Sequence, residues 1–166
     1  MIHSNALILG LDPGSRKAGY GIVTSHRQYV TSGCIRLNEP ELNDRLVTLY
    51  QSINQILKAH PQIQRCAIEQ VFMAKNAQSA LKLGHARGVL VLAVKSKGID
   101  VFDYSARRVK QCVTGMGQAD KQQVGTMVTR LLNLSKQPQE DAADALAVAL
   151  TDATEGLFHA KIGAAS

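Results

Sequence analysis

Short apolar runs bounded by turn-forming residues open the chain and predict three successive strands. The runs cover residues 6–12, 19–24 and 29–36, and a Pro-Gly-Ser turn at 13–15 separates the first two. Each run has the length of a strand. Short strands that follow one another directly favour an antiparallel meander.

The rest of the chain alternates between helical periodicity and two more strand-like runs. Leucine and isoleucine recur at three- and four-residue spacing from Leu42 to Ile56, ahead of Pro61, which indicates a helix. Asn38 and Glu41 resemble a capping box at its start. Further strands are predicted at 65–70 and 99–104, and further helices at 76–97, 105–113, 119–134 and 138–152. This order predicts an α/β fold, a five-stranded mixed β-sheet flanked by α-helices on both faces.

The helix at 76–97 has an unusual apolar distribution. Its segment 89–94 is apolar on every side, and Gly84 and Gly88 are four residues apart, which allows close approach. Such a helix needs cover on more than one face. Two interpretations remain open: a core helix enclosed within one chain, or a symmetric dimer formed through this helix.

Size and composition restrict the class of protein. A length of 166 residues, with 45% apolar and 19% charged residues, indicates one globular domain spanning 1–166. No apolar run approaches the roughly 18 residues of a membrane span, and no signal-peptide pattern is seen. Three widely spaced cysteines (Cys34, Cys66 and Cys112) suit reduced thiols in a cytoplasmic protein. A secreted disulfide scaffold, a membrane protein and a zinc ribbon are excluded.

Charge is unevenly distributed along the chain. Residues 65–136 carry twelve Lys and Arg against four Asp and Glu, whereas the whole chain has a net charge of +6. A basic middle segment is typical of a polyanion binder, although a solvated lysine-rich surface explains it equally well. Residues 137–166 carry five acids and one base. Carboxylates repel phosphates, so these acids suit a nucleic-acid binder only if they hold a cation.

Four acidic residues occupy positions where a purely structural role is hard to argue for all of them together. Asp12 and Glu69 end apolar strands, and Asp141 and Asp144 share a face of the last helix. Singly, turn formation explains Asp12, and the helix dipole explains Asp141. Jointly, strands ending at one edge would bring Asp12 and Glu69 together, and the helical pair could reach the same edge. Hard oxygen ligands of this kind suit Mg²⁺ or Mn²⁺. Two such ions about 4 Å apart can support phosphodiester hydrolysis.

Basic and aromatic residues near these acids are candidates for contact with DNA. Arg107, Arg108, Lys110 and Lys121 surround a Gly-Met-Gly turn, which suits contact with a phosphate backbone, although ordinary turn chemistry also explains the glycines. In the loop before residue 76, Lys75 is a further DNA-binding candidate. Phe72, in the same loop, suits a single wedge between bases or a side chain folded onto the core. Neither a GxSxG motif nor a phosphate-binding GxxxxGK[ST] loop occurs.

Several motifs in order resemble one family closely. ILGLDPGSRKAGYGIV (8–23), AIEQVFMAKNAQSALKLGHARGV (67–89), ARRVKQCVTGMGQADKQQV (106–124) and QEDAADALAVA (139–149) are similar to the RuvC family of crossover-junction endodeoxyribonucleases. These proteins are bacterial Holliday-junction resolvases of the RNase H-like fold. The resemblance covers about residues 6–153.

The resemblance implies a function and assigns roles to residues. It implies that a homodimer hydrolyses DNA during recombination and repair. The reaction would depend on Mg²⁺, with two ions per subunit and Mn²⁺ as an alternative. Symmetric nicks in two strands of like polarity would leave 5′-phosphates, and RuvA and RuvB would be partners. The implied metal ligands are Asp12, Glu69, Asp141 and Asp144; the implied phosphate-site lysines are Lys110 and Lys121; the implied wedge is Phe72.

Two rival classes of function remain. A junction-binding module would bind DNA without cutting it, and the intact set of four acids argues against this reading. A different enzyme on the same fold would cut an RNA–DNA hybrid or rRNA, or would be an actin-like ATP-dependent phosphotransferase. The last needs a second lobe, which 166 residues cannot supply.

Overall fold

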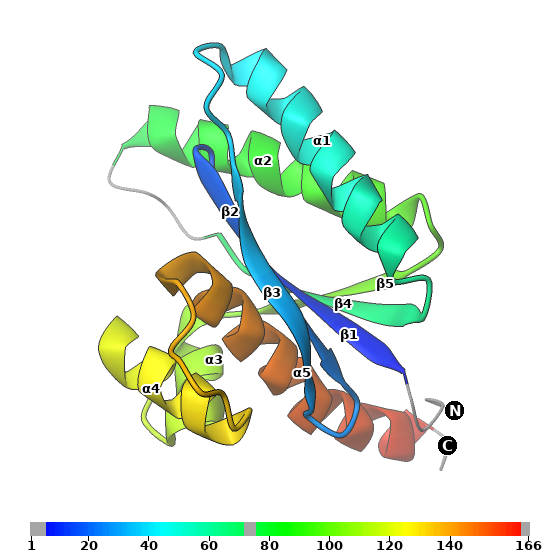
Figure 1. The fold of residues 1–166 in the computed structure, drawn as a ribbon, viewed down its shortest axis with the longest axis vertical. Coiled ribbons are helices and arrows are strands. Elements are labelled where there is room, and N and C mark those ends of the chain that lie inside the picture. The colour runs from blue at the N-terminus through cyan, green and yellow to red at the C-terminus, as the bar shows by residue number, and fades with distance from the viewer. Residues whose placement is uncertain (1–5, 72–75, 164–166) are drawn as a thin grey trace.

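Five strands form one twisted mixed sheet, with strand order β3-β2-β1-β4-β5 (Figure 1). The computed structural model describes residues 6–71 and 76–163, with side chains given as far as Gly156. β1 pairs antiparallel with β2, and β2 with β3, whereas β1–β4 and β4–β5 are parallel. The predicted meander and mixed sheet are therefore confirmed. The strands are β1 (Leu7–Asp12), β2 (Lys17–Thr24), β3 (Tyr29–Arg36), β4 (Ile63–Glu69) and β5 (Asp100–Tyr104).

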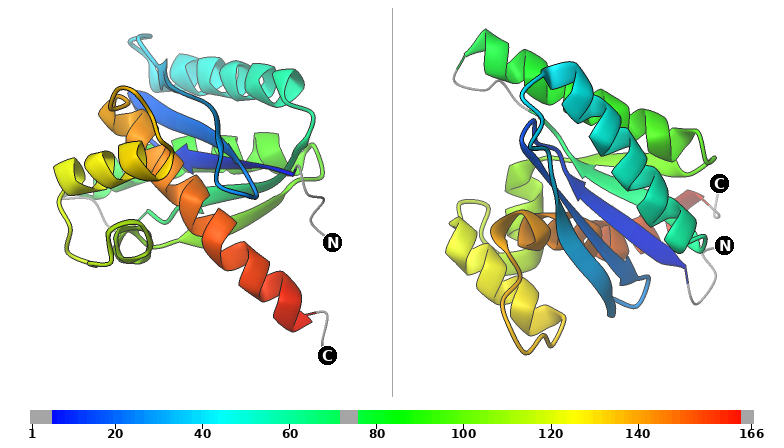
Figure 2. Two further views of the ribbon diagram at one scale, coloured as in Figure 1. Left: turned by 60° about the horizontal axis from the view of Figure 1, so that its bottom comes forward. Right: turned by 45° about the horizontal axis from the view of Figure 1, so that its top comes forward.

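Helices cover both faces of this sheet, as predicted. Two helices lie on one face and three on the other (Figures 1 and 2). The first layer consists of α1 (Leu42–Ala59) and α2 (Ala77–Lys95), and the second of α3 (Ala106–Thr114), α4 (Lys121–Leu131) and α5 (Glu140–Gly163). None of the described helices is both long and apolar enough to cross a membrane.

Helix ends differ from the prediction where local capping decides them. The Asn38–Glu41 capping box is wrong, because α1 begins at Leu42 and no side chain caps it. The amide of Leu37 donates to the carbonyl of Arg16 (2.9 Å), and Pro40 disfavours helical backbone before it, so the chain leaves the sheet extended. α4 is shorter than predicted, since Asp120 forms a true capping box with Gln123.

Alternation along the strands divides the core into two layers. Leu9, Leu11 and Ile68 point into the layer under α1 and α2, whereas Ile8 and Ala67 point toward α3, α4 and α5. Glycines of β1 and β2 lie directly beneath α5. A Cβ at Gly10 would lie 2.0 Å from the carbonyl oxygen of Ala145, and one at Gly19 would lie 1.9 Å from that of Asp141. Glycine at these two positions therefore lets α5 rest directly on β1 and β2.

One face of α2 is left uncovered by the described residues. Ala86, Leu90, Ala93 and Val94 are buried, but Leu81 and Leu92 are 61% and 60% exposed. A Cβ at Gly84 or Gly88 would meet nothing within 4 Å. The interpretation of a helix enclosed within one chain is thus wrong, because only one of its faces packs on the sheet and α1. The dimer through this helix stays a prediction.

Candidate active site

Asp12 and Glu69 lie side by side at the carboxyl ends of parallel strands. In the β1–β4 ladder Leu11 pairs with Ile68, so the two acids come next at the same edge. Leu11 and Ile68 point toward α1 and α2. Because side chains alternate along a strand, Asp12 and Glu69 point to the opposite face, where α5 lies. The predicted meeting of these acids at one sheet edge is confirmed.

α5 brings the other two acids to this edge. Asp144 lines a cavity of about 220 Å³ together with Asp12, Glu69 and two lysines. Asp141 lies one turn earlier, with its backbone carbonyl against Gly19, and Gly19 pairs with Asp12 across β1 and β2. The close contact that Gly19 permits therefore fixes the start of α5 beside the strand end. Asp141 does not line the cavity itself.

The acids oppose one another's ionisation. Burial raises the pKa of Asp12 to about 8, and the negative charges of Glu69, Asp144 and Asp141 add to the shift. Burial and the charge of Asp144 raise the pKa of Glu69, and burial first of all raises the pKa of Asp144. Raised pKa values are typical of buried carboxyl groups that lie close together with too few cations beside them. A perturbed group of this kind in a cleft marks a candidate functional site.

Two lysines provide the positive charge at this cavity. Lys121 lies 3.6 Å from Asp144 and also contacts Glu140, and both acids help raise its pKa. Lys110, on α3, lines the same cavity and counteracts the rise in the pKa of Glu69. Asp120 starts α4 and thereby places Lys121 in its first turn. The predicted approach of both lysines to the acids is confirmed.

Arg107 and Arg108, also predicted to bind DNA, do not line the cavity. Arg108 pairs with Glu155 (Nε to Oε1, 2.7 Å), and Arg107 packs beside Gly117. Both are exposed, so their contact with DNA stays a prediction. Phe72 and Lys75 lie outside the described residues.

Asp141 has neighbours that the sequence analysis missed. Lys17 lies 3.6 Å from its carboxylate, and the thiol of Cys34 lies 3.7 Å from the same Oδ2 atom. Lys17 comes from β2 and Cys34 from β3, and neither lines the cavity that holds Lys110 and Lys121. No local motif links these three residues. Only the strand register and the position of α5 reveal the contact.

The acids suit a hard divalent cation by ligand type and charge. Carboxylate oxygens are the ligands that Mg²⁺ and Mn²⁺ prefer. Asp12, Glu69 and Asp144 line one cavity, where burial and, to a smaller extent, neighbouring carboxylates raise their pKa values. Throughout residues 6–71 and 76–156, however, no three His, Cys, Asp or Glu side chains converge closely enough to surround an ion. The acids therefore form an open arrangement and not a closed cage.

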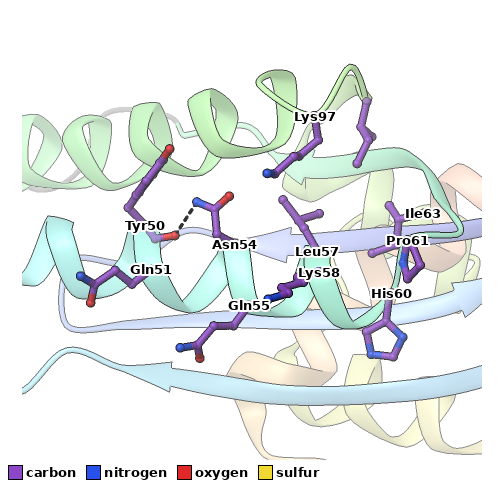
Figure 3. A pocket seen from close by; sticks show the side chains of 11 residues that line it. Tyr50, Gln51, Asn54, Gln55, Leu57, Lys58, His60, Pro61, Ile63 and Lys97 are labelled. Carbon is purple, nitrogen blue, oxygen red and sulfur yellow. Dashed lines mark hydrogen bonds between the residues drawn. The ribbon is translucent and has the colours of Figure 1, made fainter.

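A separate hollow of about 640 Å³ lies at the other end of the sheet (Figure 3). It lies between the end of α1, the start of β4 and the turn after α2, and its lining includes Leu57, His60, Ile63 and Lys97. None of the acids of the candidate site lines it. In open α/β sheets ligands bind at the carboxyl ends of the strands, which is the end where Asp12 and Glu69 lie.

Comparisons with known proteins agree with the geometry. The family model "Crossover junction endodeoxyribonuclease RuvC" matches residues 8–152. A protein of that name from Actinobacillus pleuropneumoniae is 54% identical over 151 residues, which cover 89% of this chain and 78% of the relative. Thermus thermophilus RuvC has a similar structure, with a TM-score of 0.82 and 27% identity over 92% of this chain and 96% of that one. The same protein in complex with Holliday junction substrate matches equally well, with a TM-score of 0.82 and 26% identity.

These matches confirm the RNase H-like fold and the resemblance found in the sequence. The family model extends from β1, which ends in Asp12, to Asp152 in α5, so it includes all the acids of the candidate site. The chain belongs to the RuvC family of crossover junction endodeoxyribonucleases.

Proposed function

We propose that this crossover junction endodeoxyribonuclease resolves Holliday junctions at the cluster formed by Asp12, Glu69, Asp141 and Asp144. The observation that carries the proposal is the convergence of Asp12, Glu69 and Asp144 on one cavity from two strands and a helix. The charges of the other acids raise the pKa of Asp12, and the two lysines beside the cluster would attract a phosphate group. Residues 1–166 form one nuclease domain in this proposal.

RuvC-family nucleases depend on metal, and this cluster is where we place it. The four acids would hold two Mg²⁺ ions per subunit, with Mn²⁺ as an alternative. Such ions activate water and stabilise the leaving oxygen of a phosphodiester. Through such ions the acids would hold the reacting phosphate at the strand ends, where Asp12 is largely buried.

Lys110 and Lys121 are proposed to stabilise charge on the phosphate being cut. Both line the cavity, Lys110 from α3 and Lys121 from α4. Lys121 is already placed by Glu140 and Asp144, so little ordering is needed when substrate arrives. Arg107, Arg108 and Lys75 are proposed to hold flanking phosphates, and Phe72 to hold the crossover open.

A homodimer formed through α2 is proposed for the symmetric cut. The exposed Leu81 and Leu92, with Gly84 and Gly88 open between them, form an apolar helix face suited to a second copy. Two sites related by a twofold axis would cut two strands of like polarity and leave 5′-phosphates. RuvA and RuvB are the proposed partners, in the cytoplasm.

Cleavage of a fixed four-way DNA junction tests the proposed function. Parent protein with Mg²⁺ should give paired symmetric nicks in the junction and none in a linear duplex. Glu69→Gln should bind the junction without cutting it, whereas Glu41→Gln, the same change at the exposed start of α1, should cut like the parent. Binding without cutting by the parent would indicate a junction-binding module. Preference for an RNA–DNA duplex would indicate a hybrid nuclease.

A further inference from the structure

A recess rich in arginine and lysine lies on the side of Asp141 away from Lys110 and Lys121. Its volume is about 530 Å³, and it is lined by the end of β3, the start of β2 and the start of α5. Arg16, Lys17 and Arg36 supply three cations to it, and Asp141 forms its boundary with the active site. None of these cations belongs to the lysine pair proposed to act on the phosphate being cut.

The backbone holds these cations together despite their repulsion. Lys17 pairs directly with Arg36 across the antiparallel β2–β3 ladder. Like charges directly opposite each other destabilise a sheet. Arg16 is tied to the same place, because its carbonyl accepts a hydrogen bond from the amide of Leu37 (2.9 Å). Lys17 and Arg36 are therefore held opposite each other, with Arg16 next to them, at a cost in stability that an anion bound between them would offset.

Most of this charge is not neutralised within the chain. Lys17 reaches Asp141 at 3.6 Å, and its side chain remains 61% exposed. Over the part of the chain that the structure describes, neither Arg16 nor Arg36 forms an ion pair. Glu140 also lines the recess, but its carboxylate is already paired with Lys121. Two guanidinium groups thus remain available to an anion from outside, and guanidinium groups match phosphate oxygens well.

We infer that this recess binds a backbone phosphate of the cut DNA strand, next to the phosphate that is hydrolysed. The inference rests on the proposed function, because it takes the carboxylates as the place of cleavage. A strand crossing them would meet Lys110 and Lys121 on one side and Arg16 and Arg36 on the other. Binding of the strand by cations on both sides of the cleavage position determines which phosphate lies at the acids. Phosphate contacts of this kind set position without reading sequence.

Charge-removing variants test this inference by the salt dependence of junction binding. Arg16→Gln and Arg36→Gln, alone and together, are compared with Lys58→Gln, which removes an exposed cation at the far end of α1. Binding to a four-way junction is measured without Mg²⁺ over a range of salt. The double variant should bind about tenfold more weakly and lower the salt slope by about 1 per lost contact. A slope and affinity equal to those of Lys58→Gln would overturn the inference.

Neutral phosphates in the DNA locate the contact. Single methylphosphonates are placed one at a time on either side of the cut in the same junction. One flanking position should weaken binding by the parent but have no effect on the double variant, and Arg36→Lys should regain part of the loss. Weakening of both proteins by the same amount at every position would contradict the inference. Free inorganic phosphate at the same ionic strength should compete weakly, because the recess binds a phosphate held in a strand.

Different results would contradict the nuclease function and the phosphate site in the recess. If the parent does not cut the junction, the proposed function fails, whatever the arginine variants do. If the parent cuts it and the double variant behaves like Lys58→Gln in every assay, only the phosphate site is wrong.

Discussion

Aspartates at two places on one helix, α5, have opposite surroundings. Asp144, near its start, lies in an open cavity with two other acids, and its nearest cation, Lys121, is 3.6 Å away. Asp152, eight residues later, is 1% exposed, and both of its carboxylate oxygens accept hydrogen bonds. Eight residues correspond to about 12 Å along a helix. The same residue type therefore occupies two different environments within a short distance.

Asp152 has a hydrogen-bond partner for each oxygen. Arg65 donates from Nε to Oδ2 and from Nη2 to Oδ1, both at 2.8 Å, and the hydroxyl of Tyr104 also donates to Oδ1 at 2.8 Å. The guanidinium lies 3.8 Å from the ring centroid of Phe102. This arrangement links α5 to β4 and β5. Burial and Asp152 together raise the pKa of Tyr104, which keeps the phenol protonated.

The contrast separates structural acids from functional ones. A buried carboxylate with a bidentate arginine holds elements together, since removing either partner leaves a charge without compensation. Clustered carboxylates with few partners destabilise the fold and remain useful only to a ligand of positive charge. In α5 the buried Asp152 therefore fixes the helix on the sheet, whereas Asp141 and Asp144 at its start have only partly exposed lysines at 3.6 Å and can also serve a cation.

The largest effect is expected from neutralising an acid of the active-site cluster. Asp144→Asn should lower the single-turnover rate of junction cleavage by about a thousandfold, because loss of a metal ligand removes several kcal/mol of transition-state stabilisation. Junction binding without metal should be retained. Asp44→Asn, an exposed acid in the first turn of α1, is the matched control. A rate for Asp144→Asn within tenfold of the parent would remove this residue from the site.

Neutralising the paired acid should affect stability instead. Asp152→Asn should lower the free energy of unfolding by about 3 kcal/mol, because Arg65 loses its charged partner. Urea unfolding followed by circular dichroism gives this value. Cleavage at a temperature where the variant is folded should stay within a few-fold of the parent. If cleavage fell as far as in Asp144→Asn while the fold stayed intact, the division between the two acids would be wrong.

Asp12→Asn should change how stability depends on pH in metal-free protein. The unfolded chain releases this proton near pH 4, whereas the folded chain keeps it until about pH 8. The unfolded state therefore binds fewer protons in this range, and the stability of the parent should fall as pH rises from 4 to 8.

The variant lacks that loss and should be more stable than the parent at pH 9 by at least about 2 kcal/mol, because a carboxyl whose pKa rises from about 4 to about 8 on folding destabilises the ionised protein. Easier ionisation of Glu69 and Asp144 beside the neutral Asn adds to this difference. The difference should vanish near pH 4. Thermal melts in a chelating buffer measure it. Parallel stability curves for the two proteins from pH 4 to 9 would mean that Asp12 ionises normally.

The smallest effect concerns the lysine beside the acids. Lys121→Gln should slow cleavage by about tenfold with little change in folding, because one cation near the reacting phosphate is lost. Lys95→Gln removes a lysine that also pairs with an exposed acid, Asp100, at 2.9 Å, but lies far from the cavity. Single-turnover cleavage compares the two. Equal rates for both variants would show that Lys121 contributes nothing beyond surface charge.

Local patterns in the sequence were enough to predict the sheet and the acids at its edge. Asp12 and Glu69 follow apolar runs, and parallel strands ending together bring them side by side. The contact of Arg65 with Asp152 joins residues 87 positions apart, and no local pattern encodes it. Lys17 reaches Asp141 only through the β2 register and the glycines under α5. The start of α1 was missed because a contact with the sheet, and not a cap, decides it.

Metal binding by isothermal titration calorimetry tests the central claim most directly. Mn²⁺ is titrated at pH 7 into the parent, Glu69→Gln and Glu41→Gln, in two buffers of different ionisation enthalpy. The parent and Glu41→Gln should bind Mn²⁺ and release about one proton, because Asp12 must lose its proton to become a ligand. Glu69→Gln should bind at least about tenfold more weakly. Equal affinity and equal proton release in all three proteins would contradict the assignment of the metal to this cluster.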